Sequence, residues 1–233
     1  MKKTIGILGG LSPESTIYYY QYITRKYAER FGDYSYPRII INSVTFQDYI
    51  DWGNLGNWKA VEDDMVKSIS ALKSAGADFV IIATNTMHYV YEAVSKRVEV
   101  PILSLVEAVC KYAEKLKVTK LALLGTKLTM RKPFYSEALA KIGVETLVPE
   151  PEQQDVVHGI IFSELTKGII NPSSHSKLLK IITALTEQGA EGVILGCTEI
   201  PLLIKPEDLR IHVLDSSLIH AEAALNYALA DQD

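Results

Sequence analysis

The side chain best suited to chemistry in this sequence is a cysteine that follows a buried strand. Residues 192–195 form a short apolar run, and Cys197 comes directly after Gly196, ahead of Thr198 and Glu199. In an open α/β sheet, ligands bind just outside the carboxyl ends of the strands. Backbone N–H groups at a helix start would favour the thiolate form of such a cysteine. We therefore predict that Cys197 is a catalytic acid/base.

An internal repeat gives Cys197 a partner position. Sliding the sequence so that position 84 meets position 197 aligns the preceding segments without a gap. The matched pairs are Lys67 with Lys180, Ile69 with Ile182, Gly76-Ala77 with Gly189-Ala190, and Val80-Ile81 with Val193-Ile194. Such a duplication predicts two similar lobes. We expect a ligand to bind in a cleft between them, with Thr84 and Cys197 on opposite sides.

Alternating strand and helix patterns predict an α/β fold: two pseudo-symmetric lobes, each with a mainly parallel sheet flanked by helices. We place one lobe at residues 1–104 plus 215–233 and the other at 105–214. We predict that residues 45–58 form a long loop that covers a strand end. The expected strands are 4–8, 38–43, 79–83, 100–103, 120–124, 145–148, 192–195 and 211–214. The expected helices are 13–30, 59–75, a segment after 86, 106–116, 131–142, 155–166, 174–188 and 217–230.

Composition narrows the class of protein. Hydrophobic residues make up 48% of the chain and charged residues 22%, which is ordinary for a globular protein. A net charge of −4 argues against nucleic acid or an anionic membrane as partner. No apolar run approaches the roughly 20 residues that span a bilayer. The apolar run after Met1 is too short for a signal peptide, so we expect a cytoplasmic protein.

The sequence lacks the motifs that would indicate a metal or an organic cofactor. It has two cysteines and no CxxC or HExxH pattern, so neither a disulfide framework nor a zinc site is expected. Gly6 to Gly10 do not match GxGxxG, and no Walker motif is present. Cys110 lies in a helical pattern, where a buried structural thiol is the expected role. We expect chemistry that needs no cofactor.

Two proton-transferring groups on opposite faces of a planar carbanion can invert a stereocentre. A thiol suits this role because its pKa lies near 8.5 and can be tuned. The carboxylate of an amino acid gains negative charge as its α-carbon is deprotonated, and hydrogen-bond donors at turns can stabilise that charge. The candidate donors are Asn85, Thr86, Thr126 and Thr198.

These motifs together resemble the aspartate/glutamate racemase family of cofactor-independent racemases. The resemblance covers essentially the whole chain, and any single tetrapeptide of it is weak. It rests on Gly9-Gly10-Leu11-Ser12-Pro13-Glu14-Ser15-Thr16, Asn85-Thr86-Met87-His88, Gly125-Thr126, Glu164-Leu165-Thr166-Lys167-Gly168 and Gly196-Cys197-Thr198-Glu199.

The resemblance implies racemisation of an acidic amino acid, aspartate or glutamate, by two opposed acid/base groups. It implies that Asn85 and Thr86 hold the substrate α-carboxylate, with Thr198 in the equivalent place. Lys167 would pair with the side-chain carboxylate, as its charge also suggests. Glu199 is a further site candidate that could influence the thiol, or simply a first-turn acid matched to a helix dipole. The resemblance also implies a homodimer.

The sequence departs from the family at position 84, where most members carry cysteine and this chain carries threonine. A threonine hydroxyl is a far weaker acid than a thiol and a poor base at neutral pH. The chain is similar to a subgroup that has threonine at this position. Three hypotheses remain: an atypical racemase with Cys197 as main acid/base and Thr84 on the opposite face, a one-cysteine decarboxylase or isomerase that serves one face, and a non-catalytic binder of dicarboxylates or amino acids.

Overall fold

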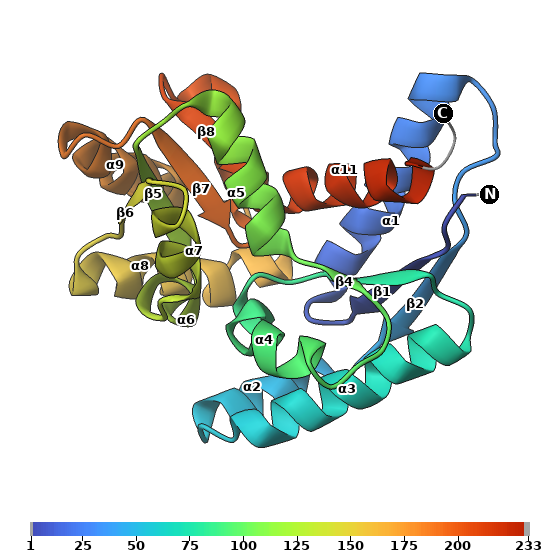
Figure 1. Cartoon of the computed structure of the whole chain (residues 1–233). Coiled ribbons are helices and arrows are strands. Elements are labelled where there is room, and N and C mark those ends of the chain that lie inside the picture. The colour runs from blue at the N-terminus through green and yellow to red at the C-terminus, as the bar shows by residue number, and fades with distance from the viewer. Residues whose placement is uncertain (1, 231–233) are drawn as a thin grey trace. The chain divides into compact units, whose positions relative to one another are not determined.

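The computed structural model describes residues 2–230, which fall into two compact units (Figure 1). Unit 1 comprises Met1–Leu105 and Ser217–Asp233, and unit 2 comprises Val106–Ser216. Each unit is an α/β layer structure with one parallel four-stranded sheet among the described residues. The predicted α/β fold with parallel sheets flanked by helices is confirmed.

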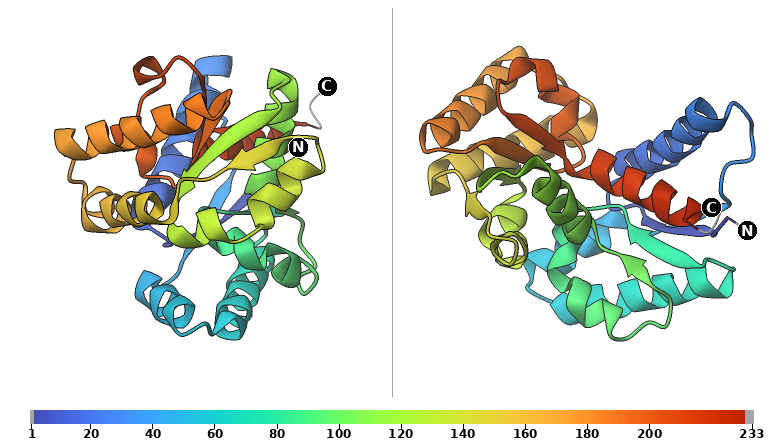
Figure 2. Two further views of the ribbon diagram at one scale, coloured as in Figure 1. Left: turned by 90° about the vertical axis from the view of Figure 1, so that its left-hand side faces the viewer. Right: turned by 45° about the horizontal axis from the view of Figure 1, so that its top comes forward.

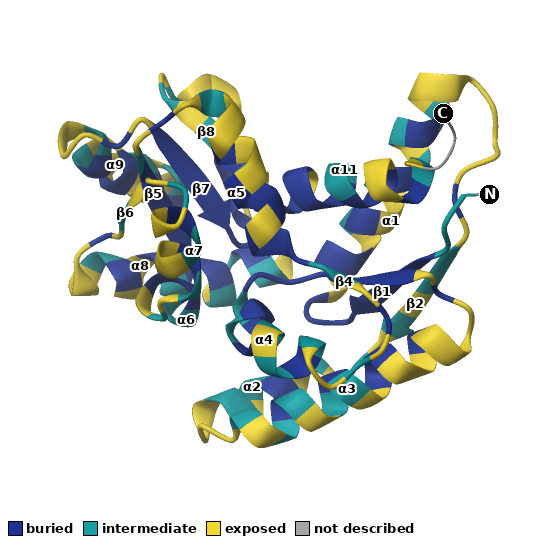
Figure 3. Cartoon of the chain, in the orientation of Figure 1, coloured by how far each residue is buried: buried dark blue, intermediate teal, exposed yellow. Residues whose placement is uncertain are grey.

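The sheet of unit 1 has the strand order β2-β1-β3-β4, and all neighbours are parallel. Its strands are β1 (Ile5–Gly9), β2 (Ile39–Ser43), β3 (Phe79–Ile82) and β4 (Ile102–Leu103). The two central strands are buried along their whole length, as expected for a parallel sheet covered on both faces. Figure 3 shows β1 as a continuous buried segment.

Alternate side chains of these strands build two separate cores. Helices α1 (Pro13–Phe31) and α11 (Ser216–Leu229) pack against one set of strand side chains: Ile5, Ile7, Phe79 and Ile81. Helices α2 (Phe46–Asn54) and α3 (Trp58–Ser74) pack against the other set: Leu8, Val80 and Ile82. Helices α1 and α11 run side by side (Figures 1 and 2), joined by a hydrogen bond from Tyr22 to Glu222. The helices around this sheet are α1 (Pro13–Phe31), α2 (Phe46–Asn54), α3 (Trp58–Ser74), the 3₁₀ helix η1 (Thr86–Val90), α4 (Tyr91–Ser95) and α11 (Ser216–Leu229).

Unit 2 repeats the topology with the strand order β6-β5-β7-β8, again parallel. Its strands are β5 (Lys120–Gly125), β6 (Glu145–Leu147), β7 (Gly192–Gly196) and β8 (His212–Asp215). Its helical elements are α5 (Leu105–Leu116), α6 (Lys127–Arg131), α7 (Phe134–Ala140), α8 (Pro151–Ser163), η2 (Leu165–Lys167), α9 (Pro172–Glu187), α10 (Ile200–Leu203) and η3 (Pro206–Asp208). The same strand order in both units is what a duplicated sequence predicts.

The predicted loop at residues 45–58 is wrong, because most of it is helix α2. Tyr49 anchors this helix: its side chain is buried and its hydroxyl donates to Asp64 Oδ2 of α3 at 2.9 Å. The loop-forming Gly53, Asn54, Gly56 and Asn57 gather at the helix end rather than throughout the segment. The predicted helix 131–142 starts too early, because Arg131 is the last residue of α6 and the next helix, α7, begins at Phe134 after Pro133.

The turn after β1 requires glycine at position 10. Gly10 has φ of +85°, and a Cβ built there would lie 2.4 Å from Val44 O. Its N–H donates to Thr16 Oγ1 at 2.9 Å, which ties the turn to the first turn of α1. Ser12 caps that helix, with Pro13 at its first position, as the sequence predicts.

We predict that Gly10→Ala destabilises unit 1 far more than Gly32→Ala does. Both glycines have positive φ, but a Cβ at Gly32 would meet nothing within 4 Å. Gly32→Ala should therefore cost only the left-handed backbone penalty of about 1 kcal/mol. Gly10→Ala should cost about 2 kcal/mol more, because backbone must also move.

Urea unfolding followed by tryptophan fluorescence measures this difference, since both tryptophans, Trp52 and Trp58, lie in unit 1. Equal unfolding free energies for the two variants would show that the turn relaxes without cost.

Candidate functional site

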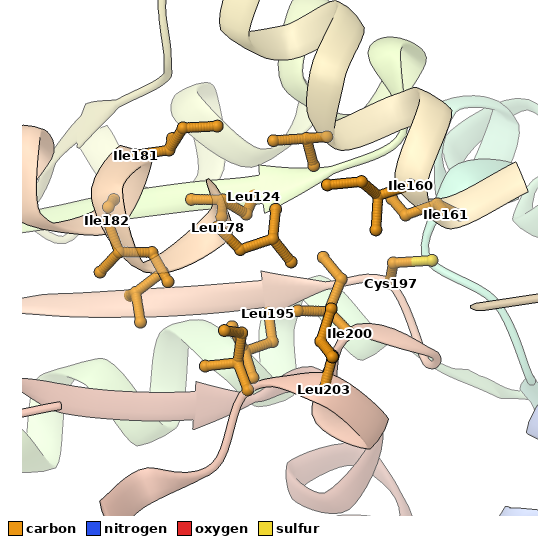
Figure 4. Packing of buried hydrophobic residues seen from close by; sticks show 14 of the residues in the cluster. Leu124, Ile160, Ile161, Leu178, Ile181, Ile182, Leu195, Cys197, Ile200 and Leu203 are labelled. Atoms are coloured by element: carbon orange, nitrogen blue, oxygen red, sulfur yellow. The ribbon is translucent and has the colours of Figure 1, made fainter. Parts of the chain in front are cut away.

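Strand β7 positions the candidate thiol of unit 2. It lies between β5 and β8 in the sheet and ends at Gly196. A Cβ at Gly196 would lie 2.9 Å from Leu124 O, so the close approach of the two strands needs glycine there. Cys197 follows and packs beside Ile160 and Ile161 of α8 (Figure 4). Only 8% of its surface is exposed.

Glu199 lies at the centre of this half of the site. Cys197 Sγ donates a hydrogen bond to Glu199 Oε2 at 2.9 Å, and Thr198 Oγ1 donates to the same oxygen at 2.7 Å. The Glu199 side chain is buried, with 4% exposed. The structure therefore brings Cys197, Thr198 and Glu199 together on a single carboxylate oxygen.

The pKa of Cys197 is raised well above the usual thiol value, first by burial and then by the negative charge of Glu199. The backbone N–H groups of Thr198 and Glu199 act in the opposite direction, as the sequence predicts, but they are outweighed. The expected lowering of this pKa is thus wrong. The following helix α10 has only four residues and begins after a carboxylate, so its dipole contributes little.

Two further predicted residues of unit 2 lie on neighbouring elements. Gly125 pairs with Gly196 in the sheet, so Thr126 and Cys197 follow equivalent positions on adjacent strands. Thr126 is buried and caps α6 by accepting from Thr129 N at 3.2 Å. Lys167 is exposed at the end of η2, which packs against α10.

Strand β3 positions the corresponding residues of unit 1. Thr84 and Asn85 come just after the strand and are buried, and Thr86 begins η1. The turn is held by backbone hydrogen bonds from Ala83 N to Leu8 O at 3.0 Å and from His88 N to Asn85 O at 3.0 Å. The predicted Thr84, Asn85 and Thr86 therefore lie at the carboxyl end of a central strand, the place that Cys197 occupies in unit 2.

Two residues that hold this turn were not predicted as site residues. Ser15 Oγ, in the first turn of α1, donates to Ala83 O at 2.8 Å. His88 Nδ1 lies 2.8 Å from Thr84 O. Both occur within the motifs that carry the family resemblance, but a serine or histidine in a helix pattern gives no sign of which carbonyl it reaches.

The described part of the chain, residues 2–230, contains no group of three or more His, Cys, Asp and Glu side chains able to hold a metal ion. Within the same residues, no helix is long and apolar enough to cross a bilayer.

Comparison with known proteins agrees with the α/β fold of the two units. The family model described as Asp/Glu/Hydantoin racemase matches residues 8–224. The broad specificity amino-acid racemase RacX of Bacillus subtilis is 28% identical over 98% of this chain and 99% of its own length.

Two solved structures are also similar. A candidate Asp/Glu racemase from Yersinia pestis is 36% identical, with a TM-score of 0.91 over 97% of this chain and 99% of its own. An aspartate racemase homologue from Pyrococcus horikoshii is 39% identical, with a TM-score of 0.85 over 98% and 99%.

The two parallel four-stranded α/β units match the two-lobed fold of racemase structures. The chain belongs to the Asp/Glu/hydantoin racemase family. It is accordingly an amino acid racemase, an isomerase.

We predict that Glu199→Gln lowers the pKa of Cys197, because it removes the adjacent negative charge while the thiol stays buried. Alkylation by iodoacetamide as a function of pH, followed by peptide mass spectrometry, measures each cysteine separately. Cys110 is the internal control: burial and Glu114 raise its pKa to about 11, and that value should not change. An unchanged pH profile at Cys197 would show that burial alone controls the thiol.

Proposed function

We propose that the enzyme racemises an acidic amino acid, aspartate or glutamate, without a cofactor, by transfer of the α-proton. Cys197 is the main acid/base, and Thr84 serves the opposite face of the α-carbon. The observation that carries the proposal is the contact of the Cys197 thiol with the buried Glu199 carboxylate at the carboxyl end of β7. A protonated, fixed thiol at a strand end is suited to deliver a proton to a carbanion.

The Glu199 carboxylate explains how a thiol with a raised pKa can also act as a base. An amino acid brings a positively charged ammonium group. Burial and the negative charge of Glu199 both raise the pKa of Cys197, and an ammonium group that approaches Glu199 offsets the second of these effects. Substrate binding would therefore lower the pKa of the thiol at the moment when proton abstraction is required.

The remaining predicted residues have roles that fit their positions. Asn85 and Thr86 supply donors at the end of β3 for the substrate α-carboxylate, which gains charge in the transition state. Thr126 and Thr198 lie at equivalent places on β5 and β7. Lys167 is exposed and positively charged, which suits the side-chain carboxylate of the substrate.

The substrate class is supported by the names of similar proteins, an aspartate racemase homologue and a broad specificity amino-acid racemase. Assignment to the subgroup with threonine at position 84 rests on the sequence motif. A homodimer and a cytoplasmic location, both expected from the sequence, stay predictions.

One observation favours a second candidate function. Thr84 offers a hydroxyl where the pseudo-symmetric position carries a thiol, and a hydroxyl is a poor base at neutral pH. An enzyme that protonates one face only, such as a one-cysteine decarboxylase or isomerase, would need no acid/base at position 84.

We expect the wild-type protein to exchange the α-proton of L-aspartate or L-glutamate in heavy water and to form the D-enantiomer. Proton NMR follows the exchange, and chiral chromatography follows the configuration. Cys197→Ala should reduce both by about 10³-fold, the scale of a lost general acid/base. Cys110→Ala, which removes the other buried thiol, is the matched control and should stay within about twofold of wild type.

The outcomes separate the hypotheses. Exchange with retained configuration would indicate an enzyme that serves one face. Binding of these amino acids without any exchange would indicate a binding protein. Racemisation that survives Cys197→Ala would overturn the catalytic assignment of Cys197.

We further predict that Thr84→Cys raises racemase turnover or broadens the range of accepted enantiomers, because a thiol is a much better acid/base than a hydroxyl. Steady-state kinetics with both enantiomers of aspartate and glutamate measure this, and Thr84→Ser is the control that keeps a hydroxyl. Identical kinetics for wild type and both variants would place Thr84 outside the proton path.

A further inference from the structure

The buried side chain of His88 joins two separate segments of unit 1. Its Nδ1 lies 2.8 Å from Thr84 O, and its Nε2 lies 3.0 Å from the backbone nitrogen of Leu105. A carbonyl oxygen can only accept and an amide N–H can only donate. Nδ1 therefore carries the proton and Nε2 accepts, so His88 is a neutral imidazole of one defined tautomer.

A second buried histidine, His220, contacts the same segment near Leu105. His220 Nε2 donates to Leu103 O at 2.9 Å, and its Nδ1 accepts from the Tyr19 hydroxyl at 2.8 Å. The rings of His88 and His220 meet edge to face, with centroids 6.1 Å apart. The two histidines thus hold both ends of the short segment from Leu103 to Leu105, where the chain leaves β4 and begins α5.

Neither ring is available for proton transfer to a substrate. Both nitrogens of each imidazole are engaged with protein groups, and a proton on Nε2 of His88 would face the N–H donor of Leu105. Burial agrees with this geometry, since it lowers the pKa of His88 to about 4 and that of His220 to about 3. The rings are therefore neutral near pH 7, and their role is to hold backbone groups in place.

The position that His88 controls is that of the backbone at Thr84. Ser15 Oγ holds the carbonyl of Ala83 from α1, and His88 holds the next carbonyl, that of Thr84. Fixing two successive carbonyl groups fixes the peptide planes on either side of the Thr84 α-carbon, and with them the direction of its side chain.

We propose that His88, supported by His220, is a positioning residue that sets the orientation of Thr84 for proton transfer at one face of the substrate. This inference rests on the proposed racemase function. It adds that inversion depends on a neutral Nδ1–H imidazole at position 88 that itself contacts no reacting atom.

Two variants of His88 and one control test the proposal. His88→Leu removes both hydrogen bonds and keeps an apolar side chain of moderate size. His88→Asn keeps an N–H donor near the position of Nδ1 and removes the acceptor at Nε2. The control is Tyr91→Phe: the Tyr91 ring stacks on His88, and its hydroxyl donates to Ile102 O at 3.2 Å.

The first measurement separates inversion from exchange with retained configuration, using both enantiomers of aspartate in heavy water. Exchange by Cys197 needs bound substrate but not Thr84, so it should persist in a His88 variant in which Asn85 and Thr86 still bind the substrate. We expect His88→Leu to lower inversion by about ten- to a hundredfold, with retained-configuration exchange within about twofold of wild type. His88→Asn should recover most of the inversion, and Tyr91→Phe should match wild type. A uniform loss of both reactions, or full inversion in His88→Leu, would overturn the proposal.

The second measurement does not depend on activity. In a Thr84→Cys background, the alkylation rate of the thiol introduced at position 84 reports its orientation and surroundings. His88→Leu should change this rate by about fivefold or more, whereas Tyr91→Phe should not. An unchanged rate would show that His88 does not position residue 84. If wild-type protein performs no inversion, the proposed function fails, while this alkylation result still decides the role of His88.

Discussion

A buried carboxylate at Glu199 sets the chemistry of unit 2. A carboxylate removed from water must be hydrogen-bonded, and here the thiol of Cys197 and the hydroxyl of Thr198 both donate to one of its oxygens. This pairing holds Cys197 in one orientation, and burial together with the Glu199 charge raises the pKa of its thiol. In the proposed mechanism, the positive charge of the substrate offsets the negative charge of Glu199, which makes the substrate part of the activation.

That arrangement relies on the sheet beneath it. β7 is buried on both faces and ends at a glycine that lets it approach β5 closely, so the next residues emerge at the carboxyl edge of the sheet. In unit 1 the corresponding strand, β3, is followed by Ala83 and Thr84, and side chains from other segments hold this turn. There the backbone carbonyls are held from outside the strand, by Ser15 and His88. In unit 2 a serine also holds a strand carbonyl, since Ser216 Oγ donates to Leu195 O at 2.7 Å.

Most of the fold was predictable because parallel strands are continuous apolar runs and their ends carry strong signals. Ser12 and Pro13 indicated the start of α1 correctly, and the repeat predicted two similar lobes, which agrees with the equal strand order of the two sheets. Helix α2 was missed because glycine and asparagine near its end suggest a loop. Its stability comes from Tyr49 packing onto α3, a contact between segments that local propensity does not contain.

The sequence by itself determined the α/β class, the duplication into two similar lobes and the places of Cys197 and Thr84 at strand ends. These follow from hydrophobic period and spacing, which are local properties. Only the tertiary structure decided the protonation state of the thiol, because burial and the Glu199 charge outweigh the backbone N–H groups that sequence reasoning emphasised. It also decided that His88 reaches both Thr84 and Leu105. Side-chain hydrogen bonds between segments that are distant in sequence depend on the tertiary fold. The spacing of residues along the sequence does not predict them.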